Sequence, residues 1–325
     1  MKVGTRGSAL ALAQTRLVTR RIPEADLGSD GLEVVVVNTS GDGLATGERP
    51  GGDKSRWVAE LEHALLAGDI DLAVHSAKDV PGEIVEGLTL LGCPERANAQ
   101  DALIGAGAID QLPQGGCVGT SSIRRTAQLL AARPDLQVIS LRGNVDTRLR
   151  RLATTVTGGR VSPPPPAQDG GGGFDAIVLA SAGLERLGRE SDVGCLLPVD
   201  RFVPAPGQGS LALQARADDE RTGAALAQLI DADATACLTA ERAVAHALRA
   251  SCNTPLGAHA VPAGCGCLHL RAWVGLPDGS EWIADELVGG FYEPAELGRR
   301  MAERLRAAGA EALLRRAEEM AIGEQ

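Results

Sequence analysis

The sequence predicts an α/β protein with more than one domain. Its 325 residues exceed what a single hydrophobic core usually organises, so two or three domains are expected. Over roughly the first 95 residues, aliphatic and β-branched runs alternate with segments of helical period, which favours a layered α/β architecture with a mostly parallel sheet. Aromatic residues make up only 2% of the chain, so the cores must be aliphatic.

The first block of elements begins with a short strand at residues 2–5. Ser8 stands where it can cap a helix expected over residues 9–20, because its hydroxyl can accept a hydrogen bond from the first helical turn. The remaining elements expected in this block are a buried strand at 33–37, a helix at 57–66 and a strand at 72–75.

A second alternating block follows, and it contains a stretch rich in proline and glycine. Four consecutive prolines and four consecutive glycines between residues 157 and 173 cannot hold a helix or a ladder, so this stretch is expected to be an exposed loop. The strands expected in the block are at 102–104, 138–141 and 176–180, and the helices are at 122–132 and 145–152.

The pattern changes from residue 232 onward. We expect a small antiparallel sheet with helices packed on one of its faces. The first helix is expected at 235–248, the strands near 257–261, 269–274 and 282–288, a long amphipathic helix at 295–307, and a shorter helix after it.

Composition and charge disfavour several classes of function. The formal net charge of −10 makes the chain a poor general binder of nucleic acid or of anionic membranes. Residues 1–6 open no apolar leader, and the apolar runs are too short to span a bilayer. The seven cysteines are scattered and odd in number, which indicates reduced thiols and a cytoplasmic protein.

One segment of this acidic chain is strongly basic. Residues 119–151 carry seven arginines against two acids, a local balance of 7 − 2 = +5, and Gly/Ser turns precede two of the expected helices. Helix N-termini bind anions and arginine forks hold carboxylates, so a pocket for several carboxylates or phosphates is expected. The alternative is a solvated helix face, which accounts well for Arg133, Arg150 and Arg151. It accounts less well for the arginines that flank the turns, which are Arg124, Arg125 and Arg142.

A polar run at residues 75–81 leaves the carboxyl end of a strand expected to be buried. Ligands of open α/β sheets bind at that edge. Asp79 is therefore a candidate for stabilising a cation on a substrate ring or for moving a proton. A pairing with Lys78 at the surface, or a turn cap, explains Asp79 equally well.

Cys252 lies in a turn-rich segment, residues 250–257, that follows an expected helix. A cysteine on such a loop is accessible for a covalent bond. The alternative is an inert small residue, which is the commoner role of a lone cysteine.

Two further motifs leave alternatives open. Cys265, Cys267 and His269 suggest a metal, but a second ligand pair at zinc-finger spacing is missing, so no metal site is expected. The run at 204–209 fits a loop that enters a strand, suitable for a hinge or a substrate contact, or simply for a connecting turn.

Several of these runs also match a known family in identity and order. The matching segments are residues 5–8, 75–81, 119–125, 141–145 and 206–209, and Cys252 with Pro255 and Gly257 fits the family's cofactor-attachment segment. On these motifs the chain resembles the family of hydroxymethylbilane synthase, also called porphobilinogen deaminase.

The resemblance implies three domains. Two of them resemble the lobes of a type 2 periplasmic binding protein with a cleft between them, and the third is a small α/β domain that carries the cysteine. Domain 1 would comprise residues 1–97 and 203–225, domain 2 the arginine-rich residues 98–202, and domain 3 residues 226–325.

The resemblance also implies a reaction. Four porphobilinogen molecules would be condensed into hydroxymethylbilane with release of ammonia, in haem-type tetrapyrrole biosynthesis. The product would grow on a dipyrromethane cofactor attached to Cys252 through a thioether. The family expectation is a monomer whose partner is the small molecule porphobilinogen, with no nucleic acid and no membrane.

The site residues follow from the same resemblance, motif by motif. Asp79 matches the catalytic carboxylate and would stabilise the cation left on the pyrrole when ammonia departs. The residues implied to bind the cofactor are Cys252, Lys78, Ser122, Arg124, Arg125, Arg142 and Gly143. The residues implied to bind substrate are Arg6, Ser8, Lys54, Arg148, Arg186 and Gln208.

Two segments depart from the family's usual pattern. Asn253 and Thr254 follow the cysteine, where the family commonly has Gln and then Val or Ile. The lid at residues 51–57 is usually richer in lysine and glycine and ends in Gly-Leu-Phe, whereas here Lys54 is retained and Trp57 takes the aromatic position. Trp57 is placed either to stack on a pyrrole or to pack at the start of a helix.

A second class of function stays open on these grounds. A non-catalytic binding protein would use the same two-lobed cleft to hold an anionic ligand. The transferase requires both Asp79 and Cys252, whereas the binding protein requires neither.

Overall fold

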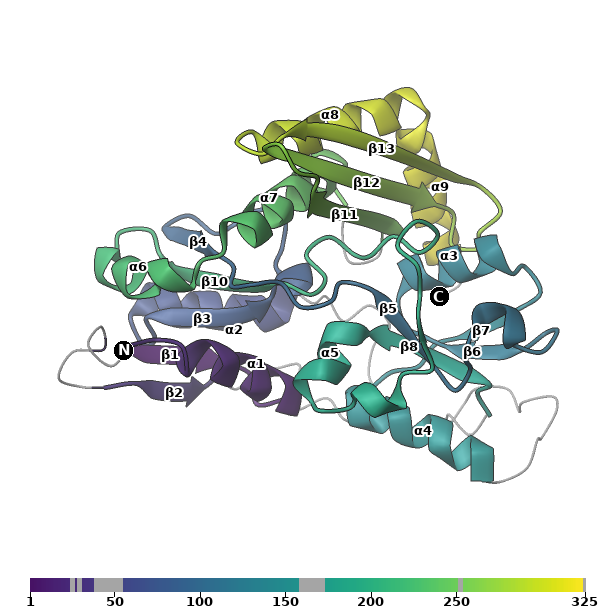
Figure 1. Ribbon diagram of the computed structural model, residues 1–325, viewed down its shortest axis with the longest axis horizontal. Helices are drawn as coiled ribbons and strands as arrows, with labels where there is room; N and C mark the ends of the chain where they lie inside the picture. The colour runs from purple at the N-terminus through teal and green to yellow at the C-terminus, as the bar shows by residue number, and fades with distance from the viewer. Residues whose placement is uncertain (24–26, 28–30, 38–54, 158–172, 251–253, 324–325) are drawn as a thin grey trace.

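The computed structural model describes residues 1–23, 27, 31–37, 55–157, 173–250 and 254–323. Within these ranges the chain forms three sheets, each covered by helices (Figure 1). Two sheets have five strands and one has three, in agreement with the α/β fold of three domains that the resemblance implies. None of the helices in these ranges is long and apolar enough to cross a bilayer. Most of the expected loop between 157 and 173 lies outside the described residues.

The first sheet mixes parallel and antiparallel strands in the order β2-β1-β3-β10-β4. Strands β1, β2 and β3 run parallel, as expected, whereas β10 is antiparallel to both of its neighbours. Because β10 comes from far along the chain, the chain returns to this sheet after passing through the second one. The elements are β1 (Lys2–Thr5), α1 (Ala9–Thr19), β2 (Glu33–Val36), α2 (Ser55–Ala67), β3 (Leu72–Ser76), β4 (Leu88–Gly92), β10 (Leu211–Arg216) and α6 (Glu220–Leu226).

The expectation that the strand at 33–37 is buried is wrong. β2 forms, but Val34 exposes 40% and Val36 47% of its surface. The physical reason is position: among the described strands β2 pairs only with β1, and it therefore lies at the edge of the sheet. A β-branched run predicts a strand, but it does not by itself distinguish an edge strand from a central one.

The second sheet has the order β7-β6-β8-β5-β9 and holds the basic segment. Strands β6, β7 and β8 are parallel, and β5 is antiparallel to β8 and β9. The elements are β5 (Asp101–Ile104), β6 (Cys117–Gly119), α3 (Ile123–Ala132), β7 (Gln137–Ile139), α4 (Val145–Thr157), β8 (Ala176–Ala180), α5 (Ser181–Arg186) and β9 (Cys195–Leu196).

The third sheet is a three-stranded antiparallel meander with helices on one face, as expected. Its aliphatic core includes Met301 and Leu305 of α8 packed against Leu268 and Leu270 of β12. The last helix is not shorter than α8, because both have 14 residues. The elements are α7 (Ala232–Ala247), β11 (Leu256–Pro262), β12 (Cys267–Gly275), β13 (Trp282–Gly290), α8 (Pro294–Ala307) and α9 (Ala310–Gly323).

A buried ion pair ties the third sheet and its helices to the rest of the chain. Glu241 of α7 has no exposed surface and accepts two hydrogen bonds from Arg96, at 2.7 and 3.1 Å. It also accepts backbone N–H bonds from Gly207 at 2.6 Å and Ala260 at 2.7 Å. Burial alone would raise the pKa of Glu241, but the positive charge of Arg96 and a bond from His259 hold that pKa below its usual value.

Breaking this pair should destabilise the protein strongly. Glu241→Gln leaves the Arg96 guanidinium largely buried without an anion, so the free energy of unfolding should fall by about 3–5 kcal/mol. The control is Glu286→Gln, which removes an exposed partner of Arg271 and should cost no more than about 1 kcal/mol. Urea denaturation measures both variants, and equal losses would contradict a special role for Glu241.

Candidate functional site

Lys78 and Asp79 lie on a single turn of 3-10 helix, η2 (Ala77–Asp79), directly after β3. The turn is therefore at the carboxyl end of a central strand, where open α/β sheets bind ligands. The loop before β10 packs against it, and Ala77 N–H donates to the carbonyl of Ser210 at 3.0 Å. Gly207 has a φ of +75°, and a Cβ there would lie 3.0 Å from the Ala77 carbonyl carbon, so only glycine fits this contact.

This packing brings Gln208 next to Lys78 and links the first two sheets. The Oε1 atom of Gln208 accepts from Lys78 Nζ at 3.3 Å and from Arg125 Nη2 at 3.4 Å. Its Nε2 atom donates to the carbonyl of Ala99 at 2.7 Å and to Asp101 Oδ1 at 2.8 Å. With only 1% of its surface exposed, Gln208 is fixed between two candidate cations, and its contact with substrate stays a prediction.

Asp101, the first residue of β5, anchors both of the arginines that follow the turn at the start of α3. Arg124 donates to its two carboxylate oxygens at 2.8 and 3.2 Å, and Arg125 Nε donates at 2.9 Å. All three side chains are buried. Burial would raise the pKa of Asp101, yet the charges of the two arginines hold it well below its usual range. Two cations therefore share one protein anion, and the expected cofactor contacts of Arg124 and Arg125 stay predictions.

Two other arginines have no carboxylate in ion-pair contact anywhere in the part of the chain that the structure describes. Arg148 donates to the carbonyl of Gly143 at 2.8 Å, and Arg186 donates to that of Gly209 at 2.5 Å. Burial lowers the pKa of each to about 10, and for Arg148 the nearby charges of Arg125 and Arg151 add to the effect. These depressed values indicate positive charge that an anionic ligand would stabilise.

The remaining candidates lie at the ends of strands and at starts of helices. Ser8 caps α1 as expected, because its Oγ accepts from the N–H of Ala11 at 3.2 Å. Ser122 precedes α3, but its hydroxyl accepts no capping bond. Arg142 is exposed on the loop before α4, and Arg6 follows β1 directly. Cys252 and Lys54 lie outside the described residues.

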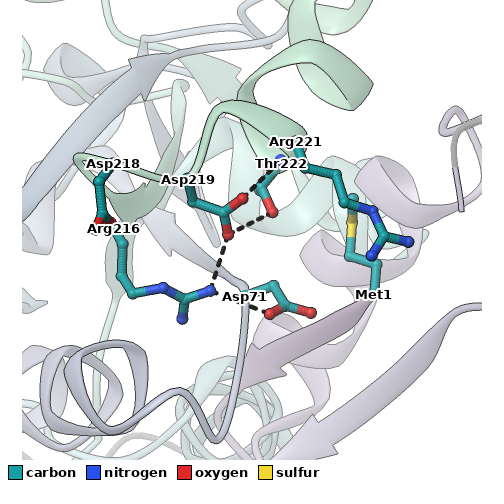
Figure 2. A pocket seen from close by; sticks show the side chains of 7 residues that line it. All are labelled: Met1, Asp71, Arg216, Asp218, Asp219, Arg221 and Thr222. Carbon is teal, nitrogen blue, oxygen red and sulfur yellow. Dashed lines mark hydrogen bonds and ion pairs between the residues drawn. The ribbon is translucent and has the colours of Figure 1, made fainter.

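A hollow of about 340 Å³ lies among the side chains drawn in Figure 2. Asp71 precedes β3 and Arg216 ends the antiparallel β10, so the hollow is at the opposite end of the first sheet from Asp79. Its charges are largely satisfied within the protein: Arg216 pairs with Asp71 at 3.2 Å and with Asp219 at 2.8 Å. Arg221 donates to the carbonyl of Leu27 at 3.2 Å. The ion pairs of this cluster join the ends of neighbouring elements, so we do not place the functional site there. The lining residues are Met1, Asp71, Arg216, Asp218, Asp219, Arg221 and Thr222.

Comparison with known families identifies the family to which the chain belongs. Residues 1–224 match the family model described as "Porphobilinogen deaminase, dipyromethane cofactor binding domain". Residues 235–307 match the C-terminal domain of porphobilinogen deaminase. The chain belongs to the porphobilinogen deaminase family. The resemblance drawn from the sequence motifs is thereby confirmed, as is the dipyrromethane-binding character of the first matched region.

Relatives in this family match nearly end to end. The porphobilinogen deaminase of Brevibacillus brevis is 42% identical over 317 residues, which cover 95% of this chain and 94% of the relative. That of Deinococcus deserti is 43% identical over 327 residues, covering 98% of each. Among solved structures, the methionine-binding protein MetQ overlaps 71% of this chain and 88% of its own, with 15% identity and a TM-score of 0.38.

The donor set suits the dipyrromethane that this family binds. The group carries several carboxylates, and in this region Arg124 and Arg125 share the single carboxylate of Asp101. Arg148 lies close enough to Arg125 for that charge to help lower the Arg148 pKa. Bidentate guanidinium–carboxylate bonds are among the strongest that proteins make. The residues therefore fit the group that the family model names.

A buried polar chain beneath Asp79 was not predicted from the sequence. His75 donates from Nε2 to Gln214 Oε1 at 2.8 Å, and Gln214 Nε2 donates to Glu62 Oε1 at 2.9 Å. All three are buried. Burial lowers the pKa of His75 from 6.5 to about 4, although the bond to Gln214 and the charge of Asp79 oppose the shift. The signal in the sequence was a histidine and a glutamine, each within a strand-like apolar run.

The buried, neutral His75 should make the protein less stable as the pH is lowered. Between pH 6.5 and about 4 the unfolded chain binds a proton that the folded chain excludes, so the free energy of unfolding should drop by about 2 kcal/mol from pH 7 to pH 5. His75→Gln keeps an N–H donor without the titration and should remove that part of the slope. The exposed His246, replaced by Gln, is the control. Urea titrations at pH 7, 6 and 5 measure the slopes, and an unchanged slope for His75→Gln would contradict the assignment.

Proposed function

We propose that this chain is a hydroxymethylbilane synthase, which condenses four porphobilinogen molecules into the linear tetrapyrrole hydroxymethylbilane and releases ammonia. One observation carries the proposal. In a chain of the porphobilinogen deaminase family, Asp79 lies at the carboxyl end of β3 beside Lys78, which Gln208 links to the buried arginines of the second sheet. A carboxylate next to a concentration of cations is what condensation of acidic pyrroles requires.

In this proposal Asp79 acts on the substrate. Loss of ammonia from porphobilinogen leaves a methylene-pyrroleninium cation, and a carboxylate beside the ring nitrogen stabilises that cation more than it stabilises the neutral ring. Opposite unit charges about 4 Å apart attract each other by roughly 4 kcal/mol at an effective dielectric constant of about 20. Neutral His75 beneath the turn adds no competing positive charge to Asp79.

The basic residues would hold the acetate and propionate groups. Arg148 and Arg186 gain most from a ligand carboxylate because neither has a carboxylate in ion-pair contact within the described ranges. Lys78 and Arg125 are held in place by Gln208. The other groups proposed to bind cofactor or substrate carboxylates are Arg6, Ser8, Lys54, Ser122, Arg124, Arg142 and Gly143.

Dipyrromethane, attached to Cys252, would supply the free pyrrole carbon to which each new unit is added. The attachment is proposed from the motif around Cys252, which stands in the chain between α7 and β11. Thr254, next to this segment, is buried at the start of the third sheet. We also propose the division into residues 1–97 with 203–225, 98–202, and 226–325, which the membership of strands in the three sheets supports.

We further propose that the protein works as a monomer in the cytoplasm, without nucleic acid or membrane. The acidic net charge of −10 supports the absence of nucleic acid and anionic membrane as partners. All six cysteines within the described ranges are free thiols, which suits a reducing compartment.

The cofactor can be tested by intact mass. Protein made in cells that produce porphobilinogen should be heavier than the bare chain by two linked pyrrole units, because Cys252 holds them covalently. Cys252→Ser should have only the chain mass, while Cys195→Ser, which changes another cysteine, should keep the excess. A folded wild-type chain at its bare mass would favour the non-catalytic binding protein instead.

The role of Asp79 can be tested separately from cofactor attachment. Asp79→Ala should keep the mass excess but lower turnover by at least about 100-fold, because the charge that stabilises the cationic ring is lost. Ammonia release from porphobilinogen measures turnover. Asp69→Ala, on the exposed loop before β3, should behave like the wild type. Release of ammonia by Asp79→Ala at the wild-type rate would refute the role.

A further inference from the structure

The hairpin between β11 and β12 has an unusual residue at its turn. Gly264, Cys265 and Gly266 have φ values of +73°, +50° and +70°, and the N–H of Cys267 donates to the carbonyl of Gly264 at 3.0 Å. Two successive positive φ values in the middle of a hairpin turn are typical of type I′, which favours Asn, Asp or Gly. Cys265 is one of only two non-glycine residues with positive φ in the described ranges.

Neither cysteine of this turn is buried, and among the described cysteines Cys265 is the most exposed, while Cys195 is partly exposed like Cys267. Cys265 is exposed and Cys267 is partly exposed. In contrast, Cys93, Cys117 and Cys237 are buried, and burial raises the pKa of these thiols to about 11, 11 and 12. Reaction at cysteine requires an accessible thiolate, so these buried thiols are poor nucleophiles at neutral pH.

The two thiols are also close enough to join. One residue separates them, and two Cα–Cα steps of about 3.8 Å meeting at a tight turn leave the ends within the roughly 7 Å that a disulfide tolerates. The sulfur of Cys267 lies 3.8 Å from the carbonyl oxygen of Cys265, so it points back over the turn. A hollow of about 290 Å³ lies beside it, lined by Asp233, Pro262, Gly264, Gly266, Cys267 and Phe291.

We propose that Cys265 and Cys267 form a thiol–disulfide exchange site that reacts with small-molecule disulfides and closes reversibly into a disulfide within the turn. This site belongs to the third sheet and is separate from the proposed chemistry at Asp79. A disulfide that is exposed and closes so small a ring is of the labile, easily reduced kind rather than a structural one.

The exchange balances in two steps. The thiolate of exposed Cys265 attacks one sulfur of the small-molecule disulfide, forming a mixed disulfide and releasing one thiolate. The thiolate of Cys267 then attacks the Cys265 sulfur, which closes the turn and releases the second thiolate. Overall, the two cysteines lose two electrons and two protons, and the small molecule gains them as two thiols.

The two thiols of this turn are less suited to binding a metal ion. Within the described ranges no group of three or more His, Cys, Asp and Glu side chains is arranged to hold a metal ion. His269, the nearby imidazole in the motif, is bonded to Glu286 at 2.9 Å. Two thiols without further ligands suit exchange with a disulfide better than a closed tetrahedral site.

The test treats the reduced full-length chain with glutathione disulfide and follows intact mass and alkylation of individual cysteines. The wild type should become two hydrogens lighter, with Cys265 and Cys267 both protected and the mixed disulfide at no more than about one-tenth, since closure is intramolecular. Dithiothreitol should restore both thiols. Cys267→Ser should instead accumulate one glutathione at Cys265.

Two variants separate the chemistry from the fold. Cys265→Asn supplies a residue that the turn favours, so it should fold normally yet lose the closed form. Cys195→Ser, which changes the partly exposed thiol outside the turn, should behave like the wild type. The proposal is overturned if both turn cysteines of the wild type stay open to alkylation under excess glutathione disulfide. It is equally overturned if glutathione accumulates there without ring closure.

Discussion

The buried carboxylate of Asp101 is the group on which the candidate site depends. It has 1% of its surface exposed and binds Arg124, Arg125 and Gln208 together. Removing a guanidinium from water costs several kcal/mol unless an anion compensates it, so two buried neighbouring arginines require this partner. One carboxylate offsets only one of the two charges, and the residual positive charge remains inside the second sheet.

The loop at residues 204–210 connects the buried Asp101 to the other two sheets. The side chain of Gln208 binds Asp101, while its backbone carbonyl accepts from Arg96, whose partner is Glu241 on α7. The N–H of Gly207 donates to the same glutamate. Side chains from all three parts of the molecule therefore converge on one loop next to the turn that carries Asp79. A small shift of this loop would move the cations of the first two sheets relative to each other.

Local structure was largely predictable from the sequence, because period and capping residues act over a few neighbours. Helix α1 begins after Ser8 as expected, and β8 spans the predicted residues 176–180. Very short strands such as β6 (Cys117–Gly119) and β9 (Cys195–Leu196) carry no detectable period. The exposure of β2 was missed because it depends on whether a second strand pairs with β2, and strand pairing is a long-range property.

The residue types of the candidate site were predictable from the sequence, but the hydrogen bonds and ion pairs between its residues were not. A high density of arginines indicated carboxylate binding, yet the sequence could not tell whether Arg124 meets an anion of the protein or of a ligand. Its partner Asp101 stands 23 positions away, directly before the strand predicted at 102–104. The family motifs identified Gln208, but its bonds to both Lys78 and Arg125 appear only when β10 returns to the first sheet.

Which arginines gain most from a ligand carboxylate depends on where the protein already supplies an anion. Arg124 and Arg125 share Asp101, so a ligand carboxylate would add to a charge that is partly neutralised. Arg148 and Arg186 have lowered pKa values and bond to backbone carbonyls, so a ligand carboxylate there relieves an existing electrostatic cost. Each added pyrrole brings two more carboxylates. A chain with a net charge of −10 can hold such a product only where cations are in local excess, and the residues around Asp101 provide that excess.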